Sequence, residues 1–243
     1  MRHFGLIGKP LSHSHSADYF NAKFRAGDID ADYTLYPIDS VDEVAALASA
    51  LSGFNVTIPY KCDIVPLLNA IDPTAEAIGA VNCVKVLPDG RLHGFNTDAA
   101  GIAATLDQAG IFAAPHPAAL ILGTGGAAAA VRHVLQSRGI DSLTVSRRYG
   151  RGDCTYAELT PETVAARTLI INATPVGMFP HTEQCPPLPY SAITPGHTLF
   201  DLIYNPAQTE FLRRGQAVGA RTINGETMFR RQAEESWRIW NND

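Results

Sequence analysis

The sequence has little of what marks nucleic-acid-binding or membrane proteins. Its 243 residues hold 19 Lys and Arg against 24 Asp and Glu, and the formal net charge of −5 lacks the basic excess that phosphate-backbone binding needs. No stretch is apolar over the roughly 18 residues that a membrane-spanning helix requires. Residues 1–7 lack the apolar segment and cleavage site of a secretory signal, so we expect none. We therefore expect a cytoplasmic protein with no nucleic acid and no membrane among its partners.

Cysteine is scarce and scattered. None of the four cysteines belongs to a Cys-x-x-Cys pair, which fits neither a disulfide framework nor a zinc site: Cys62, Cys83, Cys154 and Cys185. His13 and His15 form an isolated His-x-His pair in a serine-rich loop, and such a pair without further partners is usually solvated. We expect reduced thiols and no bound metal.

The composition itself is that of a folded globular protein. Hydrophobic residues make up 46% and charged residues 18%, and the length suits one large or two small domains. The first part alternates short β-like runs with helical patterns over residues 4–7, 17–26, 33–36, 41–51 and 54–57. Asp89-Gly90 between the runs 81–87 and 91–95 predicts an antiparallel hairpin, so we expect a mixed sheet.

A second pattern follows a helical stretch over residues 99–109 and a loop with Pro115 and Pro117, near which the composition shifts. Apolar runs recur at 118–122, 143–146, 168–171, 199–203 and 220–223, with helical patterns over 127–138 and 226–240. Runs that are apolar on both faces predict a parallel sheet covered by helices. We therefore expect a domain boundary near the prolines.

The chemistry-bearing residues of this second part follow two of the predicted strands. Gly123-x-Gly125-x-x-Ala128 lies between a strand and a helix, where glycines let backbone N–H groups approach a pyrophosphate. The alternative is a tight turn packed on its neighbour. The next strand ends in Ser146-Arg147-Arg148, where an NAD-binding fold usually places an acidic residue. Arginine favours the 2′-phosphate of NADP, although a solvated basic loop would look the same.

In the first part, polar residues lie at the ends of predicted strands. Ser14 and Ser16 are able to bind a polyhydroxy or carboxylate ligand, although Ser16 is equally placed to cap a helix. Lys61 follows the strand that contains Asn55, and its default interpretation is a surface lysine. Asp98 follows the hairpin and is either a helix cap or a functional carboxylate.

Taken together, these fragments resemble the shikimate dehydrogenase family in order and spacing. The blocks that carry the resemblance are residues 8–16, 55–61, 79–82, 94–98, 123–127, 172–178, 201–206 and 225–232. The resemblance implies an α/β fold with two domains and the active site in the cleft between them. Residues 1–98, completed by a C-terminal helix over 225–243, form an α/β substrate-binding domain with a mixed sheet, and residues 99–224 form a Rossmann-like, doubly wound NADP-binding domain.

The family reversibly reduces 3-dehydroshikimate to shikimate with NADPH, in aromatic amino-acid and chorismate biosynthesis. By motif match, Lys61 and Asp98 are the catalytic pair. The implied substrate-binding residues are Ser14, Ser16, Thr57, Asn82, Tyr204 and Gln232. The implied cofactor-binding residues are Gly123, Gly125, Gly126, Ala127, Ser146, Arg147, Arg151, Asn172, Thr174, Gly225 and Met228. A small-molecule substrate is the expected partner, and the chain is expected to be a monomer or a homodimer.

The reaction explains the catalytic pair. Hydride transfer to a ketone builds negative charge on the oxygen, so a nearby cation or acid must stabilise it and deliver a proton. Lys61 is the candidate acid. Asp98 would orient the ammonium group but also keep it protonated, which makes Lys61 a poorer base in the reverse direction. The choice between general base and electrostatic anchor stays open at this point.

Two other interpretations compete. An NAD-dependent quinate/shikimate dehydrogenase would share the fold and the catalytic pair, but Ser16 in place of threonine and Arg147 in place of an acid favour the NADP enzyme. A non-catalytic relative that binds NADP or a shikimate-like ligand is the second alternative. The intact Lys61 and Asp98 count against it.

Overall fold

The chain folds into two compact units. The structure is a computed structural model that describes residues 1–12, 14–113 and 118–242, so the predictions at His13, Pro115 and Pro117 lie outside the described residues. One unit comprises Met1–Ala100 and Gln232–Asp243, and the other comprises Gly101–Arg231. Within the part of the chain that the structure describes, no helix is both long and apolar enough to cross a membrane.

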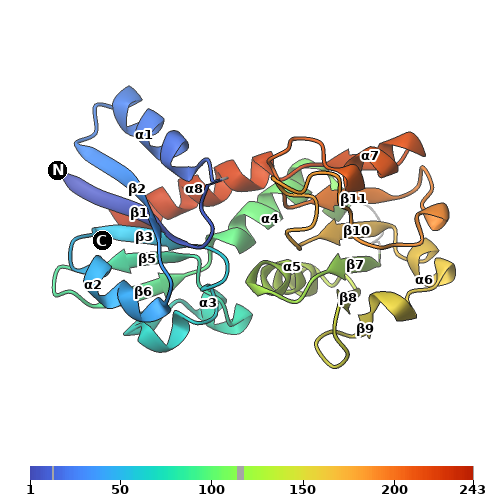
Figure 1. The fold of residues 1–243 in the computed structure, drawn as a ribbon, viewed down its shortest axis with the longest axis horizontal. Coiled ribbons are helices and arrows are strands. Elements are labelled where there is room, and N and C mark those ends of the chain that lie inside the picture. Colours follow the sequence, from blue (N-terminus) through green and yellow to red (C-terminus); the bar gives the residue numbers. More distant parts are fainter. Residues whose placement is uncertain (13, 114–117, 243) are drawn as a thin grey trace. The chain divides into compact units, whose positions relative to one another are not determined.

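The first unit is built on a six-stranded mixed sheet in the order β2-β1-β3-β5-β6-β4 (Figure 1). Its strands are β1 (Arg2–Gly8), β2 (Ala31–Pro37), β3 (Gly53–Val56), β4 (Ala70–Ile71), β5 (Cys83–Val86) and β6 (Leu92–Phe95). Strand β1 pairs in parallel with β2 and β3, whereas β5 is antiparallel to β3 and β6. The predicted hairpin and mixed sheet are confirmed.

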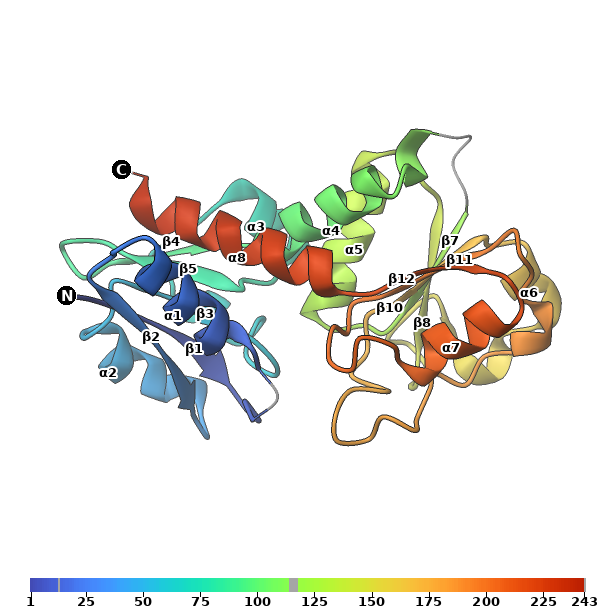
Figure 2. The ribbon, with the colours of Figure 1, turned by 90° about the horizontal axis from the view of Figure 1, so that it is seen from above.

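Helices cover both faces of this sheet (Figure 2). Helices α1 (Ser16–Ala26) and α8 (Glu226–Asn241) lie on one face, and α2 (Val44–Ala48) lies on the other. Alternate residues of β1 follow this division, because Phe4 and Leu6 pack with Trp240 of α8 while Ile7 packs with Val44 of α2. Short helices complete the unit: η1 (Val41–Glu43), η2 (Val65–Leu67) and α3 (Pro73–Ile78).

The predicted helix over residues 41–51 is shorter than expected. It consists of the 3₁₀ turn η1 followed by the single short helix α2. The Ser49 hydroxyl donates to the Ala46 carbonyl at 2.8 Å, and the Ala50 and Leu51 amides donate to carbonyls three residues earlier. These tight i,i+3 bonds end the α-helix before residue 51.

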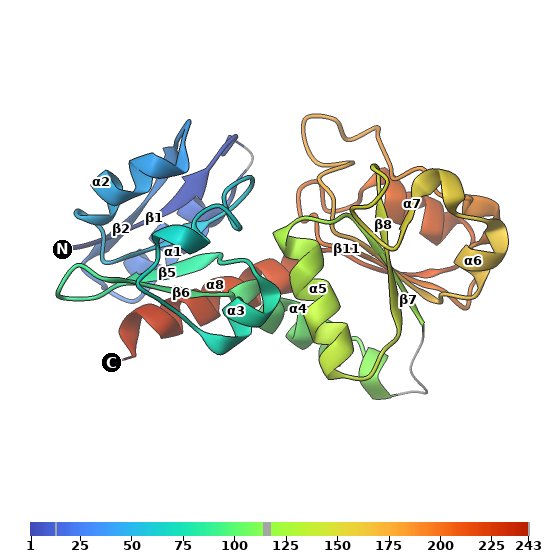
Figure 3. The ribbon, with the colours of Figure 1, turned by 90° about the horizontal axis from the view of Figure 1, so that it is seen from below.

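The second unit is built on a fully parallel six-stranded sheet in the order β12-β11-β10-β7-β8-β9, as its sequence pattern predicts. The strands are β7 (Ala119–Leu122), β8 (Ser142–Ser146), β9 (Cys154–Thr155), β10 (Leu169–Asn172), β11 (Thr198–Asp201) and β12 (Arg221–Ile223). Helix α5 (Gly126–Ser137) lies on one face, and α6 (Pro161–Ala165) and α7 (Glu210–Ala217) lie on the other (Figure 3). Helix α4 (Thr97–Gln108) begins in the first unit and continues into the second, and the remaining elements of the second unit are η3 (Ile111–Ala113), η4 (Tyr156–Glu158) and η5 (Tyr190–Ala192).

The strand order of the second unit defines where a ligand should bind. From β7 the chain continues to β8 on one side, whereas β10 pairs with β7 on the other side. In open parallel sheets, ligands bind beyond the carboxyl ends of the strands at this reversal of strand order. Gly123 follows β7 and Asn172 ends β10, so both residues flank that point.

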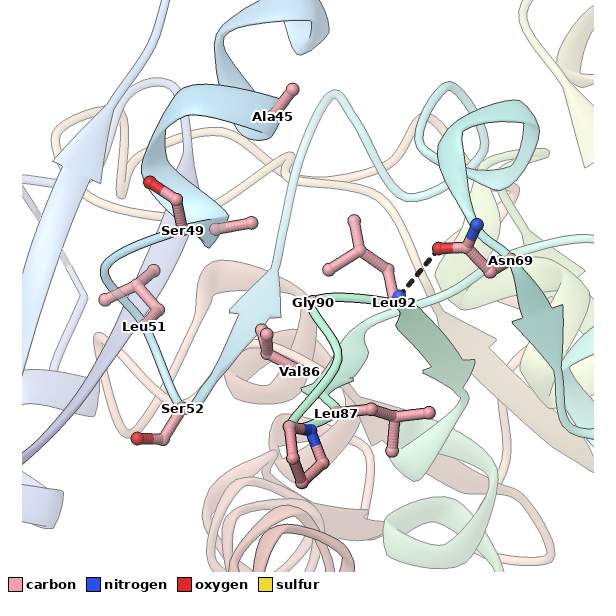
Figure 4. A pocket seen from close by; sticks show the side chains of 11 residues that line it. Ala45, Ser49, Leu51, Ser52, Asn69, Val86, Leu87, Gly90 and Leu92 are labelled. Atoms are coloured by element: carbon pink, nitrogen blue, oxygen red, sulfur yellow. Dashed lines mark hydrogen bonds between the residues drawn. The ribbon is translucent and has the colours of Figure 1, made fainter.

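A pocket of about 570 Å³ opens in the first unit between α2 and the β5–β6 hairpin (Figure 4). Its lining includes Ala45, Ser49 and Asn69, and no charged side chain contributes to it. The Asn69 side chain accepts a hydrogen bond from the Leu92 amide at 2.8 Å and is thereby engaged within the protein. None of the site residues predicted from the sequence lines this pocket.

Candidate active site

Lys61 and Asp98 form an ion pair inside the first unit. The Lys61 Nζ donates to Asp98 Oδ2 at 2.6 Å, and their side chains are 15% and 6% exposed. Lys61 is held from its backbone, where its carbonyl accepts the Val81 amide at 2.7 Å. Asp98 lies in the first turn of α4, where the helix dipole favours a negative charge. The default interpretation of Lys61 as a surface lysine is therefore wrong.

Asn82 braces this pair from the start of the hairpin. Its Nδ2 donates to Asp98 Oδ1 at 2.8 Å, so both carboxylate oxygens accept a hydrogen bond. Its Oδ1 accepts the Thr97 amide at 2.6 Å, which fixes the orientation of the Asn82 amide group. Desolvation of a buried ion pair is offset only when further hydrogen bonds satisfy the remaining atoms, and Asn82 supplies such a bond.

The structure tests the capping interpretation at two positions, Ser16 and Asp98. The Asn96 Oδ1 accepts the Ala99 amide at 3.2 Å, so Asn96 and not Asp98 caps α4. Ser16 is the first residue of α1 and does not cap it; the cap position is His15, without a side-chain capping bond. Both capping interpretations are wrong, because a residue that precedes each candidate occupies the cap region.

The other predicted substrate residues of the first unit lie at strand and helix ends. Ser14 Oγ and Ser16 Oγ are 3.2 Å apart, and Ser16 is buried. Thr57 follows β3, half-buried, with its amide donating to the Ile7 carbonyl at 2.9 Å. Gln232 on α8 accepts from Thr97 Oγ1 at 3.4 Å, which links it to the residues around Asn82.

Three polar residues of this region were missed by the sequence analysis as site residues. Thr97 Oγ1 lies 3.2 Å from Ser236 Oγ, and Ser236 Oγ accepts from Asn55 Nδ2 at 2.9 Å. All three side chains are buried. The available signal was Asn55 between two apolar strand residues, since buried polar groups need partners. This chain of hydrogen bonds ties α8 to the sheet beneath Asn82.

In the second unit, two glycines of the predicted turn behave differently. Gly123 has φ +113°, and a Cβ there would lie 3.0 Å from Thr174 Cγ2, so the fold itself requires glycine. Gly125 has ordinary extended angles, φ −86° and ψ −177°, and a Cβ there would meet nothing within 4 Å. The space above Gly125 is open, as close approach of a ligand to the backbone requires.

The start of α5 adds donors to this open space. The helix begins at Gly126, which Ala127 follows. It has no side-chain cap and carries no acidic residue in its first turn. Uncapped N–H groups at a helix N-terminus favour an anion. These residues fit the pyrophosphate of a dinucleotide.

The arginine loop after β8 is anchored at its base and exposed at its tip. The buried Ser146 accepts the Arg148 amide on Oγ at 3.0 Å. Arg147 and Arg151 are exposed. Asp153 Oδ2 accepts the Thr144 amide at 2.7 Å and so holds the far end of the loop against β8. Exposed guanidinium groups on an anchored loop suit a phosphate group.

The side chain of Asn172 is hydrogen-bonded to other residues of the protein. It is fully buried, and its Oδ1 accepts both the amide and the hydroxyl of Thr174, at 3.1 and 2.7 Å. Its Nδ2 donates to Asp201 Oδ1 at 3.1 Å. The amide group of Asn172 is thus engaged within the protein, where it shapes the loop that carries Thr174.

The remaining predicted residues of the second unit pack around the segment after β11. The Tyr204 ring lies 4.5 Å from the Phe229 ring, centroid to centroid, and Met228 is buried. A Cβ at Gly225 would collide with the Leu202 carbonyl oxygen, so this close approach requires glycine.

Metal chemistry finds no support in the described residues, where no group of three or more His, Cys, Asp or Glu side chains is placed to hold an ion. All four cysteines are free.

A parallel sheet with a glycine turn at its switch point defines the Rossmann-like class of dinucleotide-binding units, joined here to a unit that holds a part-buried Lys–Asp pair. A family model described as the shikimate dehydrogenase substrate binding domain matches residues 6–84. The shikimate dehydrogenase (NADP(+)) of Oleidesulfovibrio alaskensis is 40% identical over 98% of this chain and 88% of the relative. The chain belongs to the shikimate dehydrogenase family.

Solved structures agree. Shikimate 5-dehydrogenase from Thermus thermophilus, in complex with NADP(H) and shikimate, is 30% identical with a TM-score of 0.88, covering 99% of this chain and 94% of that chain. Quinate dehydrogenase from Corynebacterium glutamicum, in complex with NAD, is 25% identical with a TM-score of 0.85, covering 99% and 93%. The predicted fold class is confirmed.

Proposed function

We propose that this chain is an NADP-dependent shikimate dehydrogenase, which reversibly reduces 3-dehydroshikimate to shikimate. The observation that carries the proposal is the part-buried Lys61–Asp98 pair, braced by Asn82, in a chain 40% identical to a shikimate dehydrogenase (NADP(+)). The first unit serves as the substrate-binding domain, and the second serves as the NADP-binding domain. The protein acts in the cytoplasm as a monomer or homodimer on a small-molecule substrate.

Lys61 performs the acid chemistry. NADPH, when bound, supplies the hydride that adds to the ketone carbon of the substrate. Negative charge then develops on the ketone oxygen, where the Lys61 ammonium stabilises it and transfers a proton to it. One N–H of Nζ is engaged by Asp98, which leaves the other two for the substrate. Lys61 regains its proton from solvent.

Asp98 acts as the anchor. Its carboxylate accepts from Lys61 and Asn82 on separate oxygens, which fixes the direction of Nζ. The Asp98 carboxylate therefore orients the Lys61 ammonium group toward the substrate. The carboxylate and hydroxyl groups of the substrate are bound by Ser14, Ser16, Thr57, Asn82, Gln232 and Tyr204.

The second unit holds the cofactor by its backbone and its arginine loop. Amide groups of Gly125, Gly126 and Ala127 bind the pyrophosphate, with Gly123 setting the turn. Arg147 and Arg151, with Ser146 at the base of their loop, bind the 2′-phosphate. Thr174, Gly225 and Met228 border the nicotinamide, and Asn172 supports Thr174 from below. Arg147 in place of an acid supports NADP over the NAD-dependent quinate alternative.

The test is turnover with purified protein. Shikimate is mixed with NADP or with NAD, and the absorbance of the reduced nicotinamide is followed, with quinate as the alternative substrate. We expect fast turnover with shikimate and NADP, and loss of turnover in Lys61→Ala protein shown to be folded. Absence of turnover with every pair would contradict the proposal and favour a non-catalytic binding protein.

A further inference from the structure

Asp201, at the carboxyl end of β11, is a buried acid that the proposed chemistry does not use. Its Oδ1 accepts from Asn172 Nδ2 at 3.1 Å and from the Ile203 amide at 3.0 Å, and its Oδ2 accepts from Thr209 Oγ1 at 2.6 Å. Its relative exposure is 0%. Each of these partners is a neutral donor. Burying an acid among neutral donors costs free energy, so its presence calls for a role beyond packing.

The first consequence of this carboxylate is the orientation of the Asn172 amide. Because Asp201 Oδ1 is an acceptor, the NH₂ group of Asn172 faces Asp201. The Asn172 Oδ1 atom therefore faces the amide and the hydroxyl of Thr174. With the amide reversed, its NH₂ group would face the N–H of Thr174. Asp201 therefore determines that the loop after β10 closes on Asn172.

That loop lies against the glycine turn. The position of a Cβ on Gly123 is 3.0 Å from Thr174 Cγ2 and 3.1 Å from the Ala173 carbonyl oxygen. If Thr174 moved, it would press on the turn at Gly123, where the two segments already lie in close contact. The geometry thus runs from Asp201 through Asn172 to Gly123 in direct contacts.

The second consequence lies on the other side of the same oxygen. The bond from the Ile203 amide sets the direction of the chain just after β11, and the Leu202 carbonyl in that segment limits position 225 to glycine. The Gly225 amide in turn donates to the Ile203 carbonyl at 3.0 Å. Asp201 Oδ1 therefore anchors two segments: the loop after β10, which borders the switch point, and the segment after the neighbouring strand β11.

We infer that Asp201 is a positioning residue for the cofactor, because one of its oxygens holds the Asn172–Thr174 loop and the Ile203–Gly225 segment in place. The inference rests on the proposed function for the identity of the cofactor. Asp201 touches neither the cofactor nor the substrate in this role; it acts through Asn172 and Ile203.

The test compares NADPH binding and thermal stability in six proteins: wild type, Asp201→Ala, Asp201→Asn, Asn172→Ala, the Asp201→Ala/Asn172→Ala double variant, and Thr209→Val. The dissociation constant of NADPH is measured by the fluorescence of the bound cofactor, without substrate. Asn172→Ala should weaken binding by about tenfold, the size of one lost buried hydrogen bond, and Asp201→Ala, which removes the bonds to both segments, should weaken it at least as much. Because Asn172 and Asp201 act through the same hydrogen bond, the double variant should bind NADPH no more weakly than the single variant with the higher dissociation constant.

Thr209→Val is the matched control, since it removes the bond to the other carboxylate oxygen and the side-chain cap of α7. It should lower the melting temperature and leave the NADPH dissociation constant within about twofold of the wild type. Asp201→Asn should restore binding, because its amide oxygen can accept from Asn172 and Ile203 while its NH₂ donates to the Thr209 hydroxyl.

A lowered melting temperature with unchanged NADPH binding in Asp201→Ala would reduce Asp201 to a structural residue and overturn the inference. Should that variant not fold, Asn172→Ala carries the same test, and unchanged binding there would overturn it as well. Wild-type turnover is measured separately. NADPH binding without shikimate oxidation would contradict the proposed function while the binding series still decides on Asp201.

Discussion

The two units build their proposed ligand sites from different materials. In the first unit, Lys61, Asp98 and Asn82 are side chains that hydrogen-bond to one another at 2.6 to 2.8 Å. In the second unit, the turn around Gly125 presents backbone amides and open space, and Arg147 is an exposed cation. One site is a network of buried charges, and the other is a backbone surface with a solvated rim.

The difference teaches how function and stability are coupled in each unit. Substituting one member of a buried charge network leaves its partner unsatisfied, so activity and folding change together. Exposed cations and glycines that face open space have no buried partner. Substituting them should therefore change ligand binding but leave the free energy of unfolding nearly unchanged. The following predictions test that contrast, beginning with the largest effect.

Replacing Lys61 should cause the largest loss. Lys61→Ala removes the group that stabilises the oxyanion and donates the proton, so we expect kcat to fall on the order of 10³-fold. Asp98 would be left buried without its cation, which lowers the free energy of unfolding by about 3–5 kcal/mol. Steady-state kinetics and urea unfolding measure the two effects separately.

The double variant Lys61→Ala/Asp98→Asn separates the two roles. Removing both charges should recover much of the lost stability, because no buried carboxylate remains unpaired, but turnover should stay at the level of Lys61→Ala. Recovery of kcat in the double variant would contradict the role of Lys61 as the acid.

Asp201 is the exception within the second unit, because it is a buried acid. Burial raises its pKa to about 7, against the lowering effect of its bonds from Thr209, Ile203 and Asn172. Its folded pKa thus lies above the unfolded value of 3.8, so the stability it contributes is fully present below pH 3.8 and is lost as pH rises through 7.

Asp201→Asn should remove this pH dependence. The free energy of unfolding of the variant, relative to the wild type, should rise between pH 4 and pH 8 by at most about 4 kcal/mol. Urea unfolding of both proteins across that range measures the difference. A difference that is flat with pH would show that Asp201 is ionised in the folded protein throughout.

Arg147 should affect cofactor choice without affecting folding. Arg147→Ala removes a charged hydrogen bond to the 2′-phosphate, so kcat/KM for NADP should fall by about 10- to 100-fold while kcat/KM for NAD is unchanged. The melting temperature should stay constant because the side chain is exposed. Arg213→Ala, an exposed arginine on α7, serves as the control. Equal losses with both cofactors would contradict 2′-phosphate recognition.

The sequence predicts the long elements well and the short ones poorly. The strands that became β1, β7 and β10 and the mixed and parallel sheets were predicted, because apolar runs and an Asp-Gly turn are local signals. Strands β4 and β9, of two residues each, and helix α6, of five, were not. Elements of this size carry too few residues for a period to appear, and they form where neighbouring chain segments hold them.

The same limit applies to the site. Lys61 and Asp98 were named through the family resemblance, and the structure places them in contact. Ser236 was missed, because its partner Asn55 is 181 residues away and their bond exists only once α8 packs on the sheet. Asn172 was predicted as a cofactor contact, but only the folded chain shows that its amide is engaged by Asp201 and Thr174.

The smallest effect, and the sharpest test of the contrast, is expected at Gly125. Its φ of −86° suits any residue, and a Cβ would meet nothing within 4 Å, so the fold does not need glycine there. Gly125→Ala should change the free energy of unfolding by no more than about 1 kcal/mol, because alanine restricts the unfolded chain but is a poorer N-cap residue than glycine for α5. The added methyl group would hold the pyrophosphate away from the amides, so the NADPH dissociation constant should rise roughly tenfold.

Gly123→Ala is its matched counterpart in the same turn. At φ +113° and 3.0 Å from Thr174, an added Cβ strains the fold, so this variant should lose stability and binding together. Thermal unfolding and NADPH fluorescence on the two variants decide the matter. An unchanged NADPH dissociation constant in Gly125→Ala would mean that the turn only connects β7 to α5. Neither the fold nor a bound cofactor would then require glycine at position 125.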